Sequence, residues 1–376
     1  MTSNRSFPGT QPTSPWPRLW TAALVFGLTL LLVAVPLAAQ TNPPGLAPLA
    51  GLASAGAALG AVQERGGPRV DPTNRSEAAN FYNEYYVIPD DLNLEWSGNY
   101  TDCSAGSTGQ RFREAILRRI NYFRAMAGVP ADVTFSDDYN RKAQAAALMM
   151  SANRRLSHSP TQDWQCYSQD GADGAGNSNL YLQVLSPDAI DGYMDDPGDH
   201  NIVVLRRWLL FPQTMQMGTG DVPALGDNPA ANALWVIDTA HYFDARPQTR
   251  DGYVAWPPRG FVPEHLIFDR WSISYADADF GNAQVTMTLN GQPVGVNVVS
   301  DGPGYGEATI AWEPNLGEAA SSFSAAGGDN SFHVSVSNVR VDGAVRTFDY
   351  EITTFQPGPP AAATLTTRLF APYVTR

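Results

Sequence analysis

The hydrophobic period of this chain changes once, after Trp256-Pro257-Pro258, and that change limits the architectures it can adopt. Before this point apolar residues recur at helical spacing, and after it they alternate with period two, as in half-buried strands. With 376 residues, 43% of them hydrophobic, the chain has room and apolar material for two cores. The sequence therefore predicts a part that contains helices, followed by an all-β part.

Two helices are well specified in the first part. One follows Gly109 and ends before Gly128 and Pro130, which supply a left-handed cap and a block to further helix. The second opens at Ser136 or Asp137, whose oxygens can cap it, carries an alanine-rich face, and ends near residues 155–156. The apolar face of the first helix comprises Phe112, Ile116, Ile120 and Phe123.

The rest of the first part is less regular. We expect a loop rich in Gly, Ser and Asp over residues 159–179, and an acidic stretch over 188–199. An apolar segment follows at 202–211, and residues 233–237 predict a short buried strand.

The second part predicts an immunoglobulin-like β-sandwich of six or seven short strands. Asn290-Gly291, between two alternating runs, predicts a two-residue hairpin turn. The alternating runs are 271–275, 285–289, 294–298, 309–312, 332–336 and 348–352.

Charge and the N-terminal segment constrain partners and location. The formal charge is −13 and Lys142 is the one lysine, so a nucleic-acid partner is excluded. Basic residues, an apolar run and Ala38-Ala39 predict that residues 1–39 are a secretory signal peptide or, if uncleaved, an N-terminal membrane anchor. We therefore expect an extracellular or cell-surface protein, with membrane contact only through that segment.

The two cysteines, Cys103 and Cys166, predict one disulfide, because an exported chain with an even cysteine count favours pairing. A protease dyad of Cys166 with His158 would instead need a free thiolate. The disulfide is the stronger interpretation.

Several motifs, taken in order, resemble the CAP superfamily of cysteine-rich secretory, antigen 5 and pathogenesis-related proteins, in its bacterial secreted form with an appended β domain. They are Asn121-x-x-Arg124-x-x-x-Gly128, His158-Ser159, residues 177–180, residues 205–212 with 217–220, and Trp235-Val236. The resemblance implies an α/β/α sandwich. The expected organisation is signal 1–39, flexible linker 40–75, CAP domain 76–245, connection 246–270, β-sandwich 271–356 and tail 357–376.

CAP domains carry a cleft with two His and two acidic residues, arranged as if to hold a divalent cation. Here the resemblance places His158 at one such position, but Ser178, beside Asn179, where an acid is expected. Counting back from Pro212 and Gly218 places Leu205 at the second His position. Either Asp191 or Asp195 could be the remaining acid.

Two alternatives stay open. His200 follows a Pro-Gly turn and could replace Leu205 in a shifted register, making a degenerate metal pair with His158. The carboxylates of Asp188, Asp191, Asp195, Asp196 and Asp199 could hold Ca²⁺, although their spacing matches no EF-hand loop and a solvated acidic loop is the default.

The sequence favours a non-catalytic extracellular binding module, with no catalytic residues assigned and no cofactor expected beyond the divalent cation left open above. Its expected ligand is a peptide, glycan or lipid in the CAP groove, near Trp164 and Tyr167. The alternative is a secreted metal-dependent hydrolase acting on peptide or cell-wall polymers. A third interpretation is a structural surface protein whose tail, 365–376, has an anchoring role.

Overall fold

The structure is a computed structural model that describes residues 66–89, 91–197, 202–302, 305–317 and 329–358. These residues all belong to one compact unit, Ala58–Arg376. The predicted signal peptide, most of the linker and the tail from residue 359 lie outside the described residues. Within the described part, no helix combines the length and apolar character needed to cross a bilayer.

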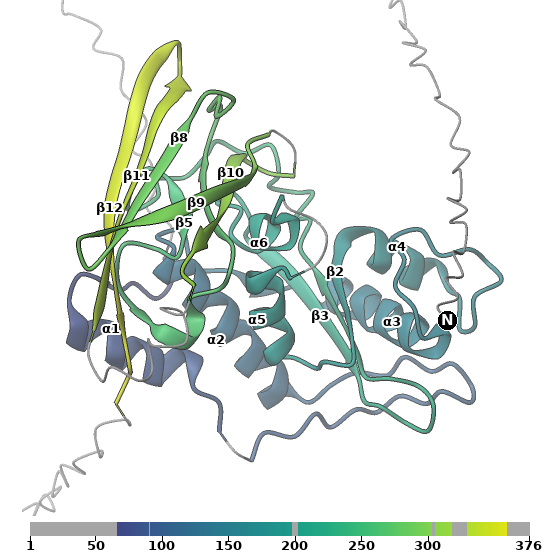
Figure 1. Cartoon of the computed structure of the whole chain (residues 1–376). Helices are drawn as coiled ribbons and strands as arrows, with labels where there is room; N and C mark the ends of the chain where they lie inside the picture. The colour runs from purple at the N-terminus through teal and green to yellow at the C-terminus, as the bar shows by residue number, and fades with distance from the viewer. Residues whose placement is uncertain (1–65, 90, 198–201, 303–304, 318–328, 359–376) are drawn as a thin grey trace, which may run out of the picture. The chain divides into compact units, whose positions relative to one another are not determined.

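The first part is built on a four-stranded mixed sheet with the strand order β1-β3-β4-β2 (Figure 1). β1 and β3 are parallel, whereas β4 is antiparallel to both of its neighbours. The strands are β1 Thr134–Phe135, β2 Ser178–Leu182, β3 Gln216–Val222 and β4 Ala231–Trp235.

Helices cover both faces of this sheet, and β4 shows how its sequence separates them. Ala233 and Trp235 pack in one core with α3 Asp137–Asn153 and α4 Gln169–Asn177. Leu234 faces the other way, into a core with α2 Gln110–Met126 and α5 Asp188–Asp195. Because successive strand side chains alternate between faces, this division confirms the predicted three-layer arrangement.

Glycines in β3 let α3 lie unusually close to the sheet. A Cβ atom added to Gly220 would lie 2.2 Å from the backbone nitrogen of Gln144 in α3. Gly218 approaches α3 in the same way, at Tyr139. The Gly-x-Gly motif is thus explained by packing, because any side chain at Gly220 would push the helix off the sheet.

The two predicted helices are confirmed as α2 and α3. Gly109 is the N-cap of α2, and Gly128 has a φ of +78° just beyond its end. Ser136 is the N-cap of α3, but its side chain makes no capping hydrogen bond. The predicted start of the helix is therefore confirmed, but the prediction that the Ser136 hydroxyl caps it is wrong.

The loop predicted over residues 159–179 is partly wrong, because it contains α4 and the start of β2. Glycine-rich sequence normally disfavours helix. Here a Cβ on Gly174 would lie 2.2 Å from the Lys142 carbonyl oxygen, so the glycines allow α4 to pack against α3. Tertiary packing therefore overrides local propensity.

Short helices also occupy the next two segments. The acidic stretch forms α5 and the apolar segment contains α6 Val204–Leu209. Before α2 lie α1 Arg75–Phe81 and a π-helical turn, η1 Tyr82–Tyr86.

The second part is all β, as predicted, but its eight strands form one continuous curled sheet in the order β5-β7-β10-β9-β8-β11-β12-β6 (Figure 1). Asn290 and Gly291 have φ values of 50° and 80° and join β8 to β9, so the predicted hairpin turn is confirmed. The strands are β5 Val254–Trp256, β6 Gly260–Pro263, β7 Trp271–Tyr275, β8 Gln284–Leu289, β9 Gln292–Ser300, β10 Ala308–Asn315, β11 Asn330–Val341 and β12 Ala344–Phe355; η2 Glu264–Leu266 follows β6.

One hydrophobic core runs through both parts. It includes Phe123 and Ile190 from the helical part together with Trp256 and Trp271 from the β part. Two buried arginines of α6 add polar links: Arg206 donates to Ser272 Oγ at 3.1 Å, and Arg207 donates to the Glu307 carbonyl at 2.7 Å.

Candidate functional site

His158 lies in the turn that follows α3 and is exposed to solvent. Its Nδ1 is 2.8 Å from the carbonyl oxygen of Ala175, in the last turn of α4. Because a carbonyl can only accept a hydrogen bond, Nδ1 must donate, which leaves Nε2 as the basic nitrogen of a neutral ring. The contact caps α4 and fixes the imidazole against that helix.

Ser178, Asn179 and Leu205 are brought together around the start of β2. The Asn179 side chain donates to the Leu205 carbonyl at 3.1 Å, and the Leu205 amide donates to the Asp196 carboxylate at 3.0 Å. Ser178 is 4% exposed and its hydroxyl has no hydrogen-bond partner. The backbone of Leu205 is therefore held from both sides, by Asn179 and by Asp196.

Asp191 is directed into a different contact. Its carboxylate forms an ion pair with Arg119 of α2 at 2.5 Å and accepts a hydrogen bond from the Tyr86 hydroxyl at 2.8 Å. The Arg119 guanidinium also lies 3.6 Å from the centre of the Tyr86 ring. Burial raises the pKa of Asp191 and outweighs the opposing effect of Arg119. This acid serves the packing of η1 against α2 and α5.

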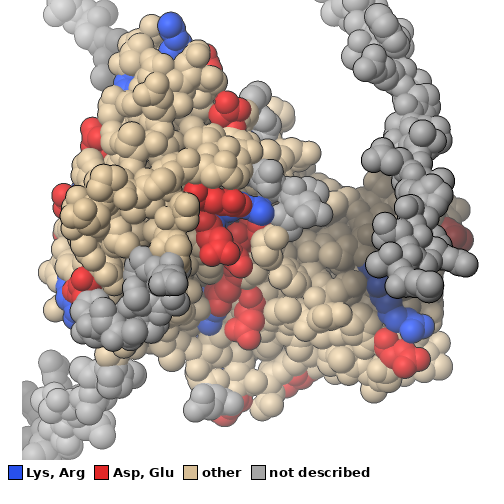
Figure 2. Space-filling model, in the orientation of Figure 1, with Lys and Arg blue, Asp and Glu red and all other residues tan. Residues whose placement is uncertain are grey.

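Asp195, one turn further along α5, keeps a freer carboxylate. Burial raises its pKa, and the nearby Asp269 of the β part raises it further, against Arg206. Figure 2 shows acidic side chains gathered in a band across the middle of this face. Among the described residues, no hydrogen bond or ion pair joins Asp191 or Asp195 to His158.

The acidic stretch is not the solvated loop that the sequence predicts. Asp188, Asp191 and Asp195 lie on α5, and the Asp196 side chain caps the Leu205 amide. Asp199 and His200 lie outside the described residues.

The described residues do not fit the divalent cation that CAP domains imply. No three His, Cys, Asp or Glu side chains among them converge to hold a metal ion. At the predicted positions stand an aliphatic Leu205, a hydroxyl at Ser178 and an Asp191 already paired with arginine. No chemical step through a metal is derived from them.

The Asn-x-x-Arg motif of α2 is explained as a clamp. Arg124 is fully buried and donates to four carbonyls, those of Pro130, Leu209, Phe211 and Thr214, at 2.8–3.3 Å. Asn121 donates to the Val133 carbonyl at 3.1 Å. Both side chains hold the segments that carry α6 and β1 against α2, so their role is positional.

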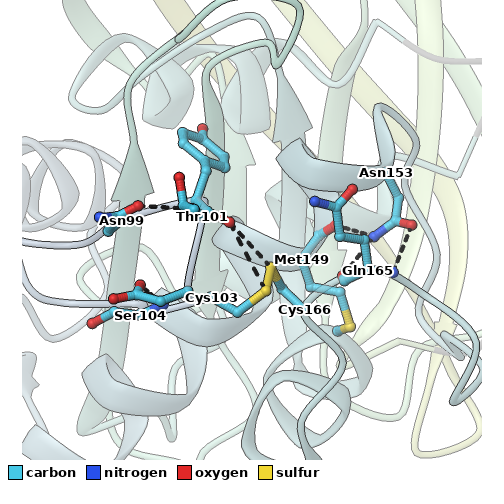
Figure 3. Close-up of a disulfide and its surroundings, with 10 residues drawn as sticks. Asn99, Thr101, Cys103, Ser104, Met149, Asn153, Gln165 and Cys166 are labelled. Carbon is cyan, nitrogen blue, oxygen red and sulfur yellow. Dashed lines mark hydrogen bonds between the residues drawn. A yellow bond between two sulfur atoms is a disulfide. The ribbon is translucent and has the colours of Figure 1, made fainter.

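The predicted disulfide between Cys103 and Cys166 is present, with a Cα–Cα distance of 5.1 Å (Figure 3). Asn153, at the end of α3, donates to the Gln165 carbonyl at 2.9 Å and accepts from the Gln165 amide at 3.0 Å. The disulfide therefore ties the segment before α2 to the loop that leads into α4, and the Asn153 hydrogen bonds fix that loop against the end of α3.

Four cavities in the described part lie elsewhere. One of about 360 Å³ lies beside the end of α2, at Gly128 and Arg250, and one of about 590 Å³ lies at Glu264 and Glu313. None of the four is lined by His158, Ser178 or Leu205.

A second oriented histidine was missed by sequence reasoning. Asp238, just after β4, accepts from the backbone amides of Met215 and Gln216 at 2.9 and 2.8 Å, and its Oδ2 lies 2.8 Å from Nδ1 of His241. Asp and His three residues apart in a turn are a weak signal, because the amides that anchor the carboxylate come from the distant start of β3.

Comparison with known proteins assigns the first part. Residues 117–235 match the family model of the cysteine-rich secretory protein family, CAP. This part of the chain is therefore a CAP domain, and an all-β region follows it. No curated protein matches the chain.

Two solved structures show partial likeness. PcoC, a methionine-rich copper resistance protein from Escherichia coli, is 15% identical, with a TM-score of 0.19, over 27% of this chain and 93% of its own. Its selenomethionine form is 14% identical, with a TM-score of 0.20, over 29% and 100%. At such TM-scores neither match informs the fold or the ligands of this chain.

Proposed function

We propose that this protein is an exported, non-catalytic CAP-domain binding module that acts outside the cell or on its surface. The observation that carries the proposal is which residues stand at the positions where CAP domains have two His and two acidic residues, and what those residues contact. Leu205 is held in place by Asn179 and Asp196, and Asp191 is paired with Arg119. At these positions the described residues provide an anchored backbone but no converging acid and imidazole, which hydrolysis needs.

The buried Ser178 hydroxyl supports binding over chemistry. Ser178 is 4% exposed, and its buried hydroxyl, which has no protein partner, costs free energy unless a ligand or water pairs with it. It can donate or accept one hydrogen bond without charge, which suits an uncharged group of a peptide, glycan or lipid. The N-terminal segment of residues 1–39 supports export.

The test restores the missing groups and asks what changes. Zinc titration by calorimetry should show no stoichiometric binding to the natural protein, and binding in the double variant Ser178→Glu, Leu205→His, where His158 completes the set. Leu205→Ala serves as the control for a packing effect. Chelator-sensitive hydrolysis of casein or peptidoglycan by the natural protein would contradict the proposal. Sequencing the N-terminus of the secreted protein tests export.

A further inference from the structure

An aromatic surface lies outside the CAP groove and has no role in the proposal above. It consists of five rings from α6, the loop after β4 and the loop before β10, namely Trp208, Phe211, Tyr242, Phe243 and Tyr305. Phe243 is 91% exposed and Tyr305 is 53% exposed. Exposed aromatic side chains that cluster in this way mark an interaction site more often than isolated ones do.

The rings form a continuous run. Phe243 meets Tyr242 edge to face with centroids 4.9 Å apart, and Tyr242 lies 5.4 Å from Phe211 and 6.1 Å from Trp208. Trp208 in turn meets Tyr305 at 6.3 Å. Contacts of this geometry hold the inner rings in place, and each outer ring packs against one of them while its own surface stays exposed to solvent.

An oriented imidazole adjoins the run. His241 directly precedes Tyr242 and Phe243, is 28% exposed, and is held through Nδ1 by Asp238. The Asp238 carboxylate is itself fixed by the backbone amides at the start of β3. A positioned ring nitrogen beside apolar faces is the combination by which binding sites orient a polar ligand.

Charge at this surface selects against anionic ligands. Arg246 is paired with Glu307, and Arg207 donates to backbone carbonyls of Glu307 and Ile202. The cations beside the rings are thus engaged, and the whole chain carries −13. Phosphate-bearing headgroups and acidic polymers are repelled, whereas an uncharged ligand is not.

We propose that this surface binds a neutral oligosaccharide. Sugar rings present an apolar face of C–H groups that stacks on flat aromatic side chains, and hydroxyls that pair with a group such as His241. Phe243 and Tyr305 supply the stacking faces, and the inner rings support them.

The experiment is native affinity electrophoresis of the full secreted chain in gels containing hydroxyethylcellulose, laminarin or galactomannan. At least one polymer should retard the natural protein. Phe243→Ala and Tyr305→Ala should each weaken that retardation by about tenfold, as removal of an interface aromatic does. Leu225→Ala is the matched control: it is 60% exposed and lies in the turn between β3 and β4, at the far end of both strands.

Every other outcome overturns the inference. No retardation by any of the three polymers, or retardation of the double variant Phe243→Ala, Tyr305→Ala equal to that of the natural protein, would contradict glycan binding at this surface. Loss of binding to phosphatidylcholine vesicles in Phe243→Ala, without glycan binding, would assign the surface to a membrane. A dimer of the natural protein that becomes a monomer in Phe243→Ala, measured by light scattering, would assign it to self-association. Zinc titration of the groove variants is unaffected by any of these results, so the two proposals fail separately.

Discussion

The two faces of the CAP sheet are stabilised by different means. On the α3 and α4 face, small residues dominate, helices and strands lie very close together, and a disulfide closes the edge. On the α2 and α5 face, the core is large, continues into the β part, and contains buried arginines that hold backbone carbonyls. Both faces use buried polar side chains to hold backbone groups, but on the α3 face the clamp is a neutral amide, Gln144, whereas on the α2 face it is charged arginine. The comparison shows that helices packed close to the sheet need only short neutral clamps, whereas the more distant segments around α6 are reached by long arginine side chains.

The largest expected effect lies on the arginine face. Arg124→Ala removes donors from four carbonyls and leaves them buried, so unfolding free energy should fall by up to about 5 kcal/mol, measured by urea denaturation. Arg124→Lys, which keeps the charge but not the planar fork, should fall in between. Arg141→Ala, at a half-exposed site, is the control. Equal losses of unfolding free energy in Arg124→Ala and Arg141→Ala would contradict the proposed difference between the two faces.

The disulfide tests the opposite face. Replacing both Cys103 and Cys166 by Ser releases a loop with a sequence separation of 63 and should cost about 3–4 kcal/mol, chiefly by freeing the unfolded chain. Thermal unfolding with and without reductant measures the effect, and reductant should not change the double variant. A loss below about 1 kcal/mol would mean that the small-residue packing suffices alone.

Asp221, a fully buried carboxylate of β3, makes the stability of the sheet depend on pH. It accepts from the Ser186 amide at 2.8 Å and from the Thr219 hydroxyl at 3.2 Å, and burial raises its pKa to about 6. Its ordinary pKa is 3.8, so between about pH 4 and pH 6 the folded state binds more protons than the unfolded state. This group's contribution to stability is therefore lost as pH rises through that window.

Asp221→Asn should abolish the loss, because the amide never ionises and the Thr219 hydroxyl can reverse its hydrogen bond. Relative to the natural protein, the variant should gain up to about 3 kcal/mol between pH 4 and pH 7. Asp227→Asn, at an exposed turn, is the control. Parallel pH profiles for the natural protein and Asp221→Asn would show that the carboxylate does not titrate in this range.

The smallest effect belongs to the β part. Asn290→Ala places a Cβ-bearing residue without a polar side chain at φ 50° and removes the bond that Asn290 accepts from the Ser331 amide, costing about 1–2 kcal/mol by denaturant unfolding. Asn290→Gly relieves the backbone but not the lost bond, so it separates the two causes. Asn297→Ala, at an exposed position of β9, should leave the unfolding free energy unchanged. A loss there as large as that of Asn290→Ala would mean that the turn has no special contribution to stability.

What the sequence could predict follows from how local the signals are. The faces of α2 and α3 and the Asn290-Gly291 turn depend on neighbouring residues, and all appear where predicted. The helix α4 could not be predicted, because only its close contact with α3 makes a glycine-rich segment helical.

The candidate site divides in the same way. The even cysteine count predicted the disulfide, and the resemblance to the CAP pattern singled out Leu205 and Asn179, whose contact the structure shows. Sequence spacing could not distinguish Asp191 from Asp195, because the partners of Asp191, Arg119 and Tyr86, lie more than seventy residues earlier in the chain. For the same reason, the sequence could not predict that the amides of Met215 and Gln216 anchor Asp238.

The core shared by the helical and β parts has a consequence for the order of events during synthesis. A chain that emerges from its N-terminus presents α2 and α5 before Trp256, Trp271 or the acceptors of Arg206 and Arg207 exist to cover them. The apolar faces of α2 and α5 therefore stay partly exposed until the last third of the polypeptide has been synthesised. Under the export proposed above, that delay would keep the chain unfolded enough to pass through a membrane channel until most of it has crossed.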